Sequence, residues 1–166
     1  MGLPGRRAGF FLVSLACAGA MGFAFYAQYH MGLEPCPLCM LQRVGVVSVG
    51  VLALLAGLIN PRRAGYRVWS ALIVLAALAG LSVSGRQLWL QSLPADQVPQ
   101  CGPGLDYLLE TLPFTHALEK VLMGSGECAV VDWRFLGMAM PFWVAVFFVG
   151  VIAFMLLQQR KMRSSW

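Results

Sequence analysis

Four long runs of apolar residues constrain this chain more than any other feature of its sequence. They cover residues 8–29, 40–59, 66–90 and 138–157. A helix of about 20 residues, rising 1.5 Å per residue, crosses a hydrocarbon layer of about 30 Å. Since only helices and closed barrels satisfy their backbone inside lipid, we expect an all-α membrane protein. The chain, residues 1–166, is then a single integral membrane domain, a bundle of four transmembrane helices.

The overall composition agrees with a membrane protein and argues against nucleic-acid binding. Hydrophobic residues make up 59% of the chain and charged residues only 11%, whereas a soluble domain carries roughly a quarter charged residues. The net charge is +5, but the cations lie at the ends of the apolar runs. A basic stripe with interleaved aromatic residues, the usual footprint of a nucleic-acid surface, is absent from the sequence.

The first apolar run has two possible interpretations. Its basic start at Arg6 and Arg7 and its small residues also fit a cleavable signal peptide. The run is longer than the apolar region of such peptides, which spans roughly 7–15 residues. It also ends in aromatic residues that suit a membrane interface: Phe23, Phe25, Tyr26 and Tyr29. We therefore expect a retained span.

The positive charges predict the orientation of the four spans. With four crossings, most of the 12 Lys and Arg residues fall on one side of the membrane, and all 7 Asp and Glu residues fall on the other. Cytoplasmic loops carry the excess of Lys and Arg, so both termini are expected in the cytoplasm and the loops 30–39 and 91–137 outside. The cations of the cytoplasmic side are Arg6, Arg7, Arg62, Arg63, Arg67, Arg160, Lys161 and Arg163.

The motif Cys36-Pro37-Leu38-Cys39 opens the second run and indicates redox chemistry. Proline is favoured in the first turn of a helix, so the motif fits a helix start. The unpaired N–H groups and the dipole at a helix start lower the pKa of a thiol, and we expect this for Cys36. Arg43 follows Cys39 by four residues and shares its helix face. It either extends to the headgroups or stabilises the Cys39 thiolate or an anionic ligand.

Three further cysteines lie elsewhere in the sequence. Cys17 is in the middle of the first run, where cysteine serves as a small apolar residue. Cys101 and Cys128 belong to the second outer loop, on the side where disulfides persist. The four outer cysteines allow three pairings. Since Cys36 and Cys39 bridge locally with little difficulty, Cys101 is left to pair with Cys128.

Two alternatives to a redox site are a zinc centre and structural disulfides. Zinc is disfavoured because Cys101 and Cys128 lack the short spacing of zinc ligands, so no metal is expected. Inert disulfides that brace the loops remain an alternative and would make the chain a membrane scaffold. A bridge between residues as close as Cys36 and Cys39 constrains the unfolded chain little, which favours the redox interpretation.

The second outer loop contains one segment with helical periodicity. Apolar residues recur after Pro113 at the spacing of one helix face. This pattern predicts a short amphipathic helix, lying on the outer leaflet or packed on the bundle. The recurring residues are Phe114, Leu118, Val121 and Leu122.

Taken together, these motifs resemble the DsbB family over essentially the whole chain. The resemblance rests on Cys36-Pro37-Leu38-Cys39, on Arg43, and on three later stretches. These are Ser125-Gly126-Glu127-Cys128, Trp133-Arg134-Phe135-Leu136-Gly137 and Met140-Pro141-Phe142-Trp143. The family consists of quinone-dependent thiol oxidases of the bacterial inner membrane, with redox loops in the periplasm.

The resemblance implies a role for each site residue. Cys101 and Cys128 match the loop pair that accepts electrons from a DsbA-like periplasmic thiol oxidase, with Cys101 the attacked sulfur. Cys36 and Cys39 match the pair that passes electrons to a membrane quinone, either ubiquinone or menaquinone. Cys39 is the thiolate that contacts the quinone, and Arg43 binds it. The expected function is reoxidation of the DsbA-like partner, which supports disulfide formation in periplasmic proteins.

The sequence also departs from the family pattern at two positions, and it leaves one related class open as a weaker alternative. Gln42 stands in place of a glutamate of the best-known member, and Ser92 in place of its histidine. Leu88 matches a leucine beside the quinone. A four-span enzyme of the vitamin K epoxide reductase kind would carry its Cys-x-x-Cys near the last span, whereas here the motif opens the second.

Overall fold

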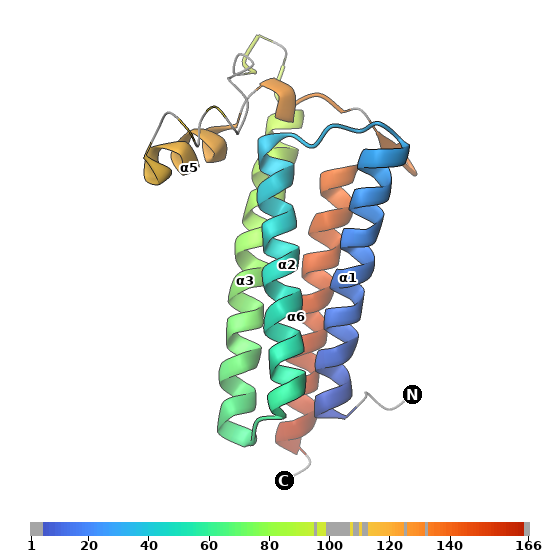
Figure 1. The fold of residues 1–166 in the computed structure, drawn as a ribbon, viewed down its shortest axis with the longest axis vertical. Coiled ribbons are helices and arrows are strands. Elements are labelled where there is room, and N and C mark those ends of the chain that lie inside the picture. The colour runs from blue at the N-terminus through green and yellow to red at the C-terminus, as the bar shows by residue number, and fades with distance from the viewer. Residues whose placement is uncertain are drawn as a thin grey trace.

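The computed structural model describes residues 5–94, 96–98, 107, 110, 113–124, 126–131 and 133–164. Its main body is an antiparallel bundle of four long helices (Figure 1). All four are long and apolar enough to cross a membrane, which confirms the predicted all-α bundle with four spans. The helices are α1 (Arg6–His30), α2 (Pro37–Ile59), α3 (Arg63–Gln91) and α6 (Met140–Ser164).

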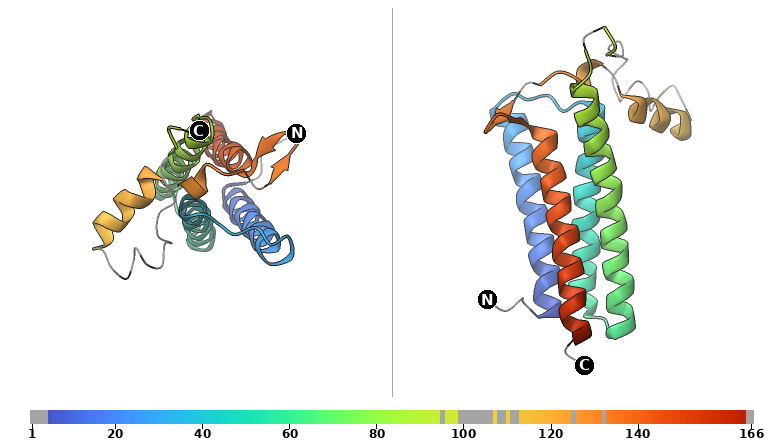
Figure 2. Two further views of the ribbon diagram at one scale, coloured as in Figure 1. Left: turned by 90° about the horizontal axis from the view of Figure 1, so that it is seen from above. Right: turned by 180° about the vertical axis from the view of Figure 1, so that it is seen from behind.

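The helices pack in a ring that is nearly open on one side. α1 packs along α2, α2 along α3, and α3 along α6, whereas α1 and α6 meet at few points. The view along the bundle in Figure 2 shows the four helices and, at their outer end, the segments that follow α3. Both chain ends and the α2–α3 turn lie at the opposite end of the bundle.

Local sequence signals explain where α2 begins and ends. Cys36 is its N-cap, in extended conformation, and Pro37 follows in the first turn, as expected from the Cys-Pro motif. Asn60 ends the helix in the left-handed conformation, with φ of 48°. Asparagine tolerates this conformation better than most residues, and proline suits the position after such a cap, where Pro61 stands.

Small residues let the helices approach closely in the middle of the bundle. The ring of Phe148, fully buried, fills the space left by Gly45 and Gly80; a Cβ on Gly80 would lie 2.3 Å from its Cζ. Cys17 is buried against Gly50, where an added Cβ would meet the Cys17 Cβ at 2.9 Å. Since apolar burial does not drive helix association within lipid, such close contacts carry the packing. Cys17 thus has the predicted packing role.

Short elements cover the end of the bundle opposite the chain termini (Figure 1). The predicted amphipathic helix is α5 (Phe114–Met123), and Arg86 of α3 donates hydrogen bonds to its last carbonyls, at 3.3 Å from Leu122 O and 3.0 Å from Met123 O. A 3₁₀ turn, η1 (Gly126–Cys128), follows. Next comes a hairpin that the sequence did not predict, made of β1 (Arg134–Phe135) and β2 (Met138–Ala139).

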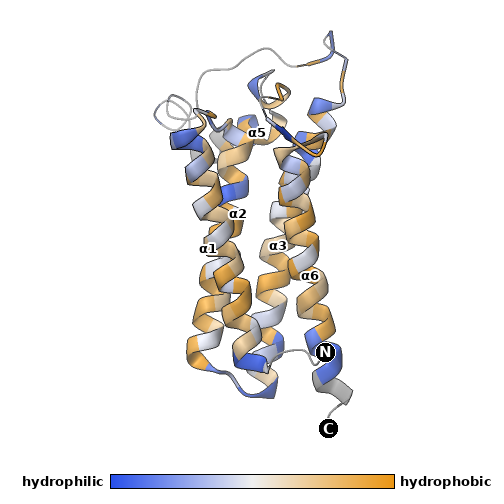
Figure 3. Cartoon of the chain, turned by 90° about the vertical axis from the view of Figure 1, so that its right-hand side faces the viewer, coloured by the Kyte–Doolittle hydropathy of each residue, from blue (hydrophilic) through white to orange (hydrophobic). Residues whose placement is uncertain are grey.

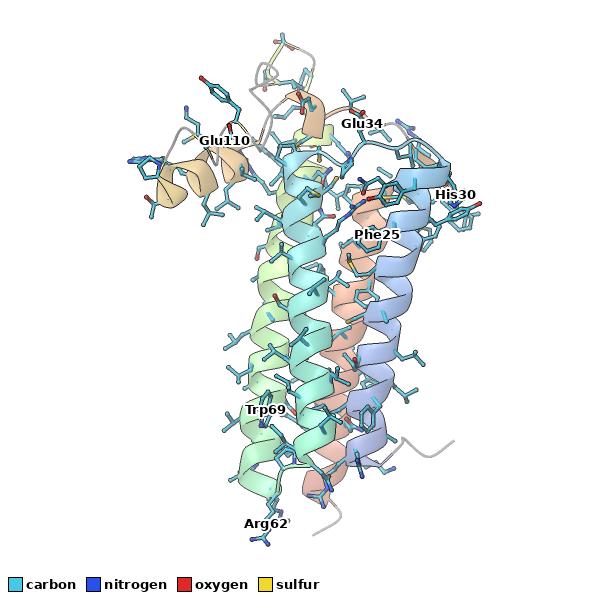
Figure 4. The ribbon with its side chains drawn as sticks, viewed as in Figure 1. Phe25, His30, Glu34, Arg62, Trp69 and Glu110 are labelled. Carbon is cyan, nitrogen blue, oxygen red and sulfur yellow. The ribbon has the colours of Figure 1, made fainter. Side chains whose placement is uncertain are left out.

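Polar residues gather at the two ends of the bundle, and apolar residues cover the helices between them (Figure 3). In Figure 3 hydrophobic colour covers the helices between the two ends of the bundle, and hydrophilic colour gathers at the ends. Figure 4 shows Arg62 at the end that carries the termini, and Glu34 and His30 at the other end, beside the loop that leads to Cys36. The two ends of the bundle are therefore chemically distinct.

Candidate functional site

Cys36 and Cys39 form the centre of the site at the N-terminal end of α2. Their Sγ atoms are 2.9 Å apart, and the backbone N–H of Cys39 donates to Cys36 Sγ at 3.4 Å. A disulfide bond is about 2.05 Å long, so the two sulfurs need only a small approach to bond. The spacing of the motif and the N-cap position of Cys36 produce this proximity without help from distant parts of the chain.

A buried glutamine of α3 contacts both sulfurs. Gln87 Nε2 donates to Cys36 Sγ at 3.3 Å and to Cys39 Sγ at 3.2 Å. The Oε1 atom of the same amide accepts a hydrogen bond from Gln42 Nε2 at 2.8 Å. Gln42 is 4% exposed and Gln87 is 2% exposed. The dithiol therefore lies against two amides that are shielded from solvent and lipid.

Cys128 lies on the other side of Cys36. It is completely buried with Leu38 and Leu90, and it shares a hydrogen bond with Cys36. That hydrogen bond, then the one with Cys39, and then burial raise the pKa of the Cys36 thiol above its usual range. The expectation that the helix start lowers the pKa of Cys36 was therefore wrong, because neighbouring thiols and burial outweigh the helix dipole.

The turn around Cys128 is fixed by packing. Gly124 has φ of +81°, and a Cβ there would lie 2.3 Å from Leu90 Cδ1. Gln91 Nε2 donates to the carbonyl of Cys128 at 3.5 Å. Gly124 thus packs against Leu90, and Gln91 holds the Cys128 backbone near the end of α3. Cys101 lies outside the described residues, so its pairing with Cys128 stays a prediction.

A cavity of about 560 Å³ opens beside Cys39. Its walls are mainly apolar and come from α1 and α6. The small side chains of α1 leave room for the cavity. Polar groups gather at the end near the dithiol, where Cys39, Gln42, Arg43 and Gln87 line the cavity. The apolar walls include Ala20, Ala24 and Ala27 of α1 and Met140, Val144 and Phe147 of α6.

Aromatic rings border the outer rim of this cavity. The ring centroids of Phe23 and Trp133 are 5.9 Å apart, those of Trp133 and Phe135 5.9 Å, and those of Phe135 and Trp143 5.6 Å. Trp143 Nε1 also donates to the carbonyl of Phe135 at 3.2 Å. All four rings line the cavity. The unpredicted hairpin therefore has a definite place, since it brings Phe135 to the cavity rim.

Arg43 lines the cavity but is bonded to α1. Its guanidinium donates to Gln28 Oε1 at 2.5 Å and to the carbonyl of Ala24 at 3.2 Å. The hydrogen bonds received by Cys39 Sγ come from Cys36 and Gln87. The hypothesis that Arg43 stabilises the Cys39 thiolate by direct contact therefore has no support in this geometry, whereas a role toward a ligand in the cavity fits its position.

Sequence reasoning missed Gln87 and Gln28. The available signal was an amide within an apolar run, since polar groups inside a span are costly unless they have a partner or a function. The resemblance aligned Leu88 and Ser92 with notable positions of the family, but neither is among the cavity-lining residues. Ser92 instead ends α3, with its hydroxyl donating to the carbonyl of Trp89 at 2.7 Å.

The arrangement suits thiol–disulfide exchange along one series of sulfurs. Cys128, Cys36 and Cys39 form a continuous series of sulfur contacts that ends at the cavity. Exchange proceeds by attack of a thiolate on a disulfide sulfur through a mixed disulfide. Exchange along this series would connect the cavity with Cys128 of η1.

Comparison with known proteins gives consistent matches along the chain. A family model described as disulfide bond formation protein DsbB matches residues 6–158. A disulfide bond formation protein B from Chromobacterium violaceum is 67% identical over 151 residues, 91% of each chain. Proteins with the same name from Marinobacter nauticus and Azoarcus are 54% identical over 159 residues and 45% over 164. They cover 95% of both chains in the first case, and 97% of this chain and 98% of the relative in the second. These matches confirm the resemblance that the motifs indicated.

Proposed function

This chain belongs to the DsbB family, and from that premise we propose that it is a protein dithiol:quinone oxidoreductase. Its relatives are named for disulfide bond formation, and the chain is a multi-pass membrane protein of that redox family. The finer proposal is that it reoxidises a DsbA-like thiol oxidase at the expense of a membrane quinone. It thereby supports disulfide formation in periplasmic proteins.

One observation carries the proposal: the series of sulfur contacts ends at an apolar cavity with a cation at its polar end. Cys39 and Arg43 both line the cavity, whose volume is about 560 Å³. Ligand pockets typically have volumes of about 300–1,000 Å³, with mainly apolar walls and a few well-placed polar groups. A structural disulfide that only braces a loop would need no such cavity.

The residues present suit a quinone. Its carbonyl oxygens accept hydrogen bonds, and the guanidinium of Arg43 offers donors where the cavity is polar. The walls from α1 and α6, with Ala24 and Phe147 among them, suit an apolar ring and tail. A quinone bound there would supply an acceptor for two electrons and two protons. Arg43 is held in place by Gln28 and Ala24, so its direction is set before a ligand arrives.

Electrons enter at the loop pair. A thiolate of the reduced partner attacks Cys101 of a Cys101–Cys128 disulfide, forms a mixed disulfide and releases the Cys128 thiolate. The second thiol of the partner then displaces Cys101, so the partner leaves as a disulfide. Cys101 and Cys128 have gained the two electrons that the partner lost.

The contact between Cys128 and Cys36 sets the next exchange. The Cys128 thiolate attacks Cys36 of the Cys36–Cys39 disulfide and expels Cys39 as a thiolate at the cavity. The thiol with the lower pKa leaves faster, and the raised pKa of Cys36 makes Cys36 the poorer leaving group of the pair. Cys101 then attacks Cys128, restores the loop disulfide and leaves Cys36 as a thiol. The Cys36–Cys39 pair now holds both electrons.

The charge distribution supports an orientation for this path. Arg62 and both termini share one end of the bundle, and the cysteine loop lies at the other. By the excess of Lys and Arg on cytoplasmic loops, the termini are cytoplasmic and the redox loops are periplasmic in a bacterial inner membrane. The partner then meets the loops in the compartment where disulfides form.

Quinone reduction by the purified protein with a reduced DsbA-like partner tests this proposal. Ubiquinone and menaquinone analogues are offered separately. The expected result is turnover in the wild type, loss of turnover in Cys39→Ser, and near-normal turnover in Cys17→Ala, which removes a buried thiol that is not among the cavity-lining residues. A wild type that reduces neither quinone would contradict the proposal.

A further inference from the structure

The buried amides of Gln42 and Gln87 do more than fill the space between α2 and α3. We propose that they form an oriented pair that keeps a hydrogen-bond donor on the Cys39 sulfur: Gln87 supplies the donor, and Gln42 is a positioning residue that acts through Gln87. Their effect on turnover rests on the function proposed above. The contact itself is a property of the dithiol and exists without quinone or partner.

The orientation of the Gln87 amide is the decisive point. A glutamine side chain can present either its NH₂ group or its carbonyl oxygen to a neighbour. Gln42 Nε2 lies 2.8 Å from Gln87 Oε1, so turning the Gln87 amide alone would set two NH₂ groups against each other; both amides would have to turn together to avoid this. The orientation with Nε2 toward the sulfurs is the one that Gln42 stabilises.

The distances agree with a donor that prefers the ionised sulfur. Cys39 Sγ is 3.2 Å from Gln87 Nε2 and 3.7 Å from Gln87 Oε1. The longer contact serves a neutral thiol, which donates weakly to oxygen, whereas a thiolate can only accept. Hydrogen bonds to charged groups contribute more than those between neutral groups, so the pair stabilises the thiolate over the thiol.

Burial strengthens this effect and limits what can replace it. Gln42 and Gln87 are 4% and 2% exposed, and a buried hydrogen bond is less weakened by competing water. Amides do not titrate, so the donor persists across the pH range in which the cysteines exchange. Arg43 donates its hydrogen bonds to α1. The side-chain amide that donates to Cys39 Sγ is that of Gln87.

Alkylation of Cys39 in the reduced protein, without quinone or partner, tests the pair. The rate at pH 7 is read from the peptide that contains Cys39, because the thiolate is the reacting form. Gln87→Met, which keeps the size but loses the donor, is expected to slow the reaction roughly tenfold. Gln42→Met is expected to slow it less, because the Gln87 donor remains but is no longer oriented.

The double variant distinguishes positioning from a general disturbance. If Gln42 acts only through Gln87, the double variant labels at the same rate as Gln87→Met, whereas independent effects multiply. Gln87→His, which restores an N–H donor, is expected to recover part of the rate. Ser84→Ala removes another buried polar group of α3, whose hydroxyl donates to the Gly80 carbonyl at 3.0 Å within the same helix, and should label normally.

The outcomes distinguish a failure of the oriented pair from a failure of the proposed function. Multiplying effects in the double variant, or unchanged labelling in Gln87→Met, would overturn the oriented pair. A thermal unfolding midpoint near that of the wild type confirms that each variant is folded. If Gln87→Met is not folded, Gln42→Met provides the test, and unchanged labelling in it would overturn the oriented pair. Slower labelling in a protein that reduces no quinone would overturn the proposed function and leave the pair standing.

Discussion

Arg43 of α2 donates a hydrogen bond to Gln28 Oε1 of α1 at 2.5 Å, and a second to the Ala24 carbonyl at 3.2 Å. The guanidinium also lies 5.7 Å from the centroid of the Phe25 ring, which Figure 4 labels at the outer end of α1. These contacts join the two helices at the polar end of the cavity. The cation is thereby fixed where a ligand would meet it.

Replacing Arg43 is expected to weaken binding in the cavity. Arg43→Ala should raise the KM for quinone roughly tenfold, since a donor to a ligand carbonyl is lost. Arg43→Lys should restore only part of the loss, because a single ammonium cannot reproduce the planar set of donors. Arg86→Ala is the control, since Arg86 bonds to α5 and should leave the KM unchanged. An unchanged KM in Arg43→Ala would remove Arg43 from the ligand site.

Labelling of Cys36 should depend on Cys128 and on pH. The raised pKa of Cys36 leaves little thiolate at pH 8, so its alkylation is slower than that of an ordinary thiol, whose pKa is about 8.5. Cys128→Ala removes the main cause of the shift, lowers the pKa toward the ordinary value, and should speed labelling at pH 8. Equal rates at pH 8 would refute the contact.

Close packing at Gly80 should be essential for stability. Gly80→Ala places a Cβ 2.3 Å from the buried Phe148 ring, and overpacking of this kind costs about 1–3 kcal/mol. Gly85→Ala, on the same helix, has nothing within 4 Å of the added Cβ. Thermal unfolding in detergent should therefore show a lower midpoint for Gly80→Ala alone. A similar midpoint for both variants would contradict the packing described here.

Gly124 should control access between the loop pair and the dithiol. Gly124→Ala combines a positive φ with a clash against Leu90, so it should displace the turn that carries Cys128. Turnover with the protein partner should fall severalfold, whereas turnover with dithiothreitol, which can reduce Cys36–Cys39 directly, should persist. Gly137→Ala shares a φ of +80° but has open space around it, and it serves as the control. Equal loss with both reductants would contradict the displacement.

Much of this architecture could be predicted because its causes are local. The apolar runs require helices, since lipid offers no other partner for the backbone. The helix start at Cys36 follows from Pro37, and the position of Arg43 relative to Cys39 follows from helical spacing. The segment after Pro113 has its apolar face in its own sequence, and it forms α5.

The rest depends on contacts between distant segments. Gln87 reaches Cys39 across 48 residues of sequence, and its role follows from how α3 packs on α2. Cys128 is buried by Leu38 and Leu90, which its glycine-rich surroundings did not indicate. The raised pKa of Cys36 is another result of that packing. The cysteines of the site could be identified from the sequence, but their contacts with Gln87 and Cys128, which set their chemistry, could not.

The most direct test of the proposed electron path is quinone reduction by a variant that lacks both Cys101 and Cys128. Reduced DsbA-like partner and dithiothreitol are each offered as the electron donor. Our account predicts that turnover with the partner is lost and that turnover with dithiothreitol continues, because Cys39 lines the cavity and Cys36 Sγ lies 2.9 Å from Cys39 Sγ. Loss of turnover with both donors, in a variant that folds normally, would contradict the claim that Cys36–Cys39 is the pair that faces the quinone.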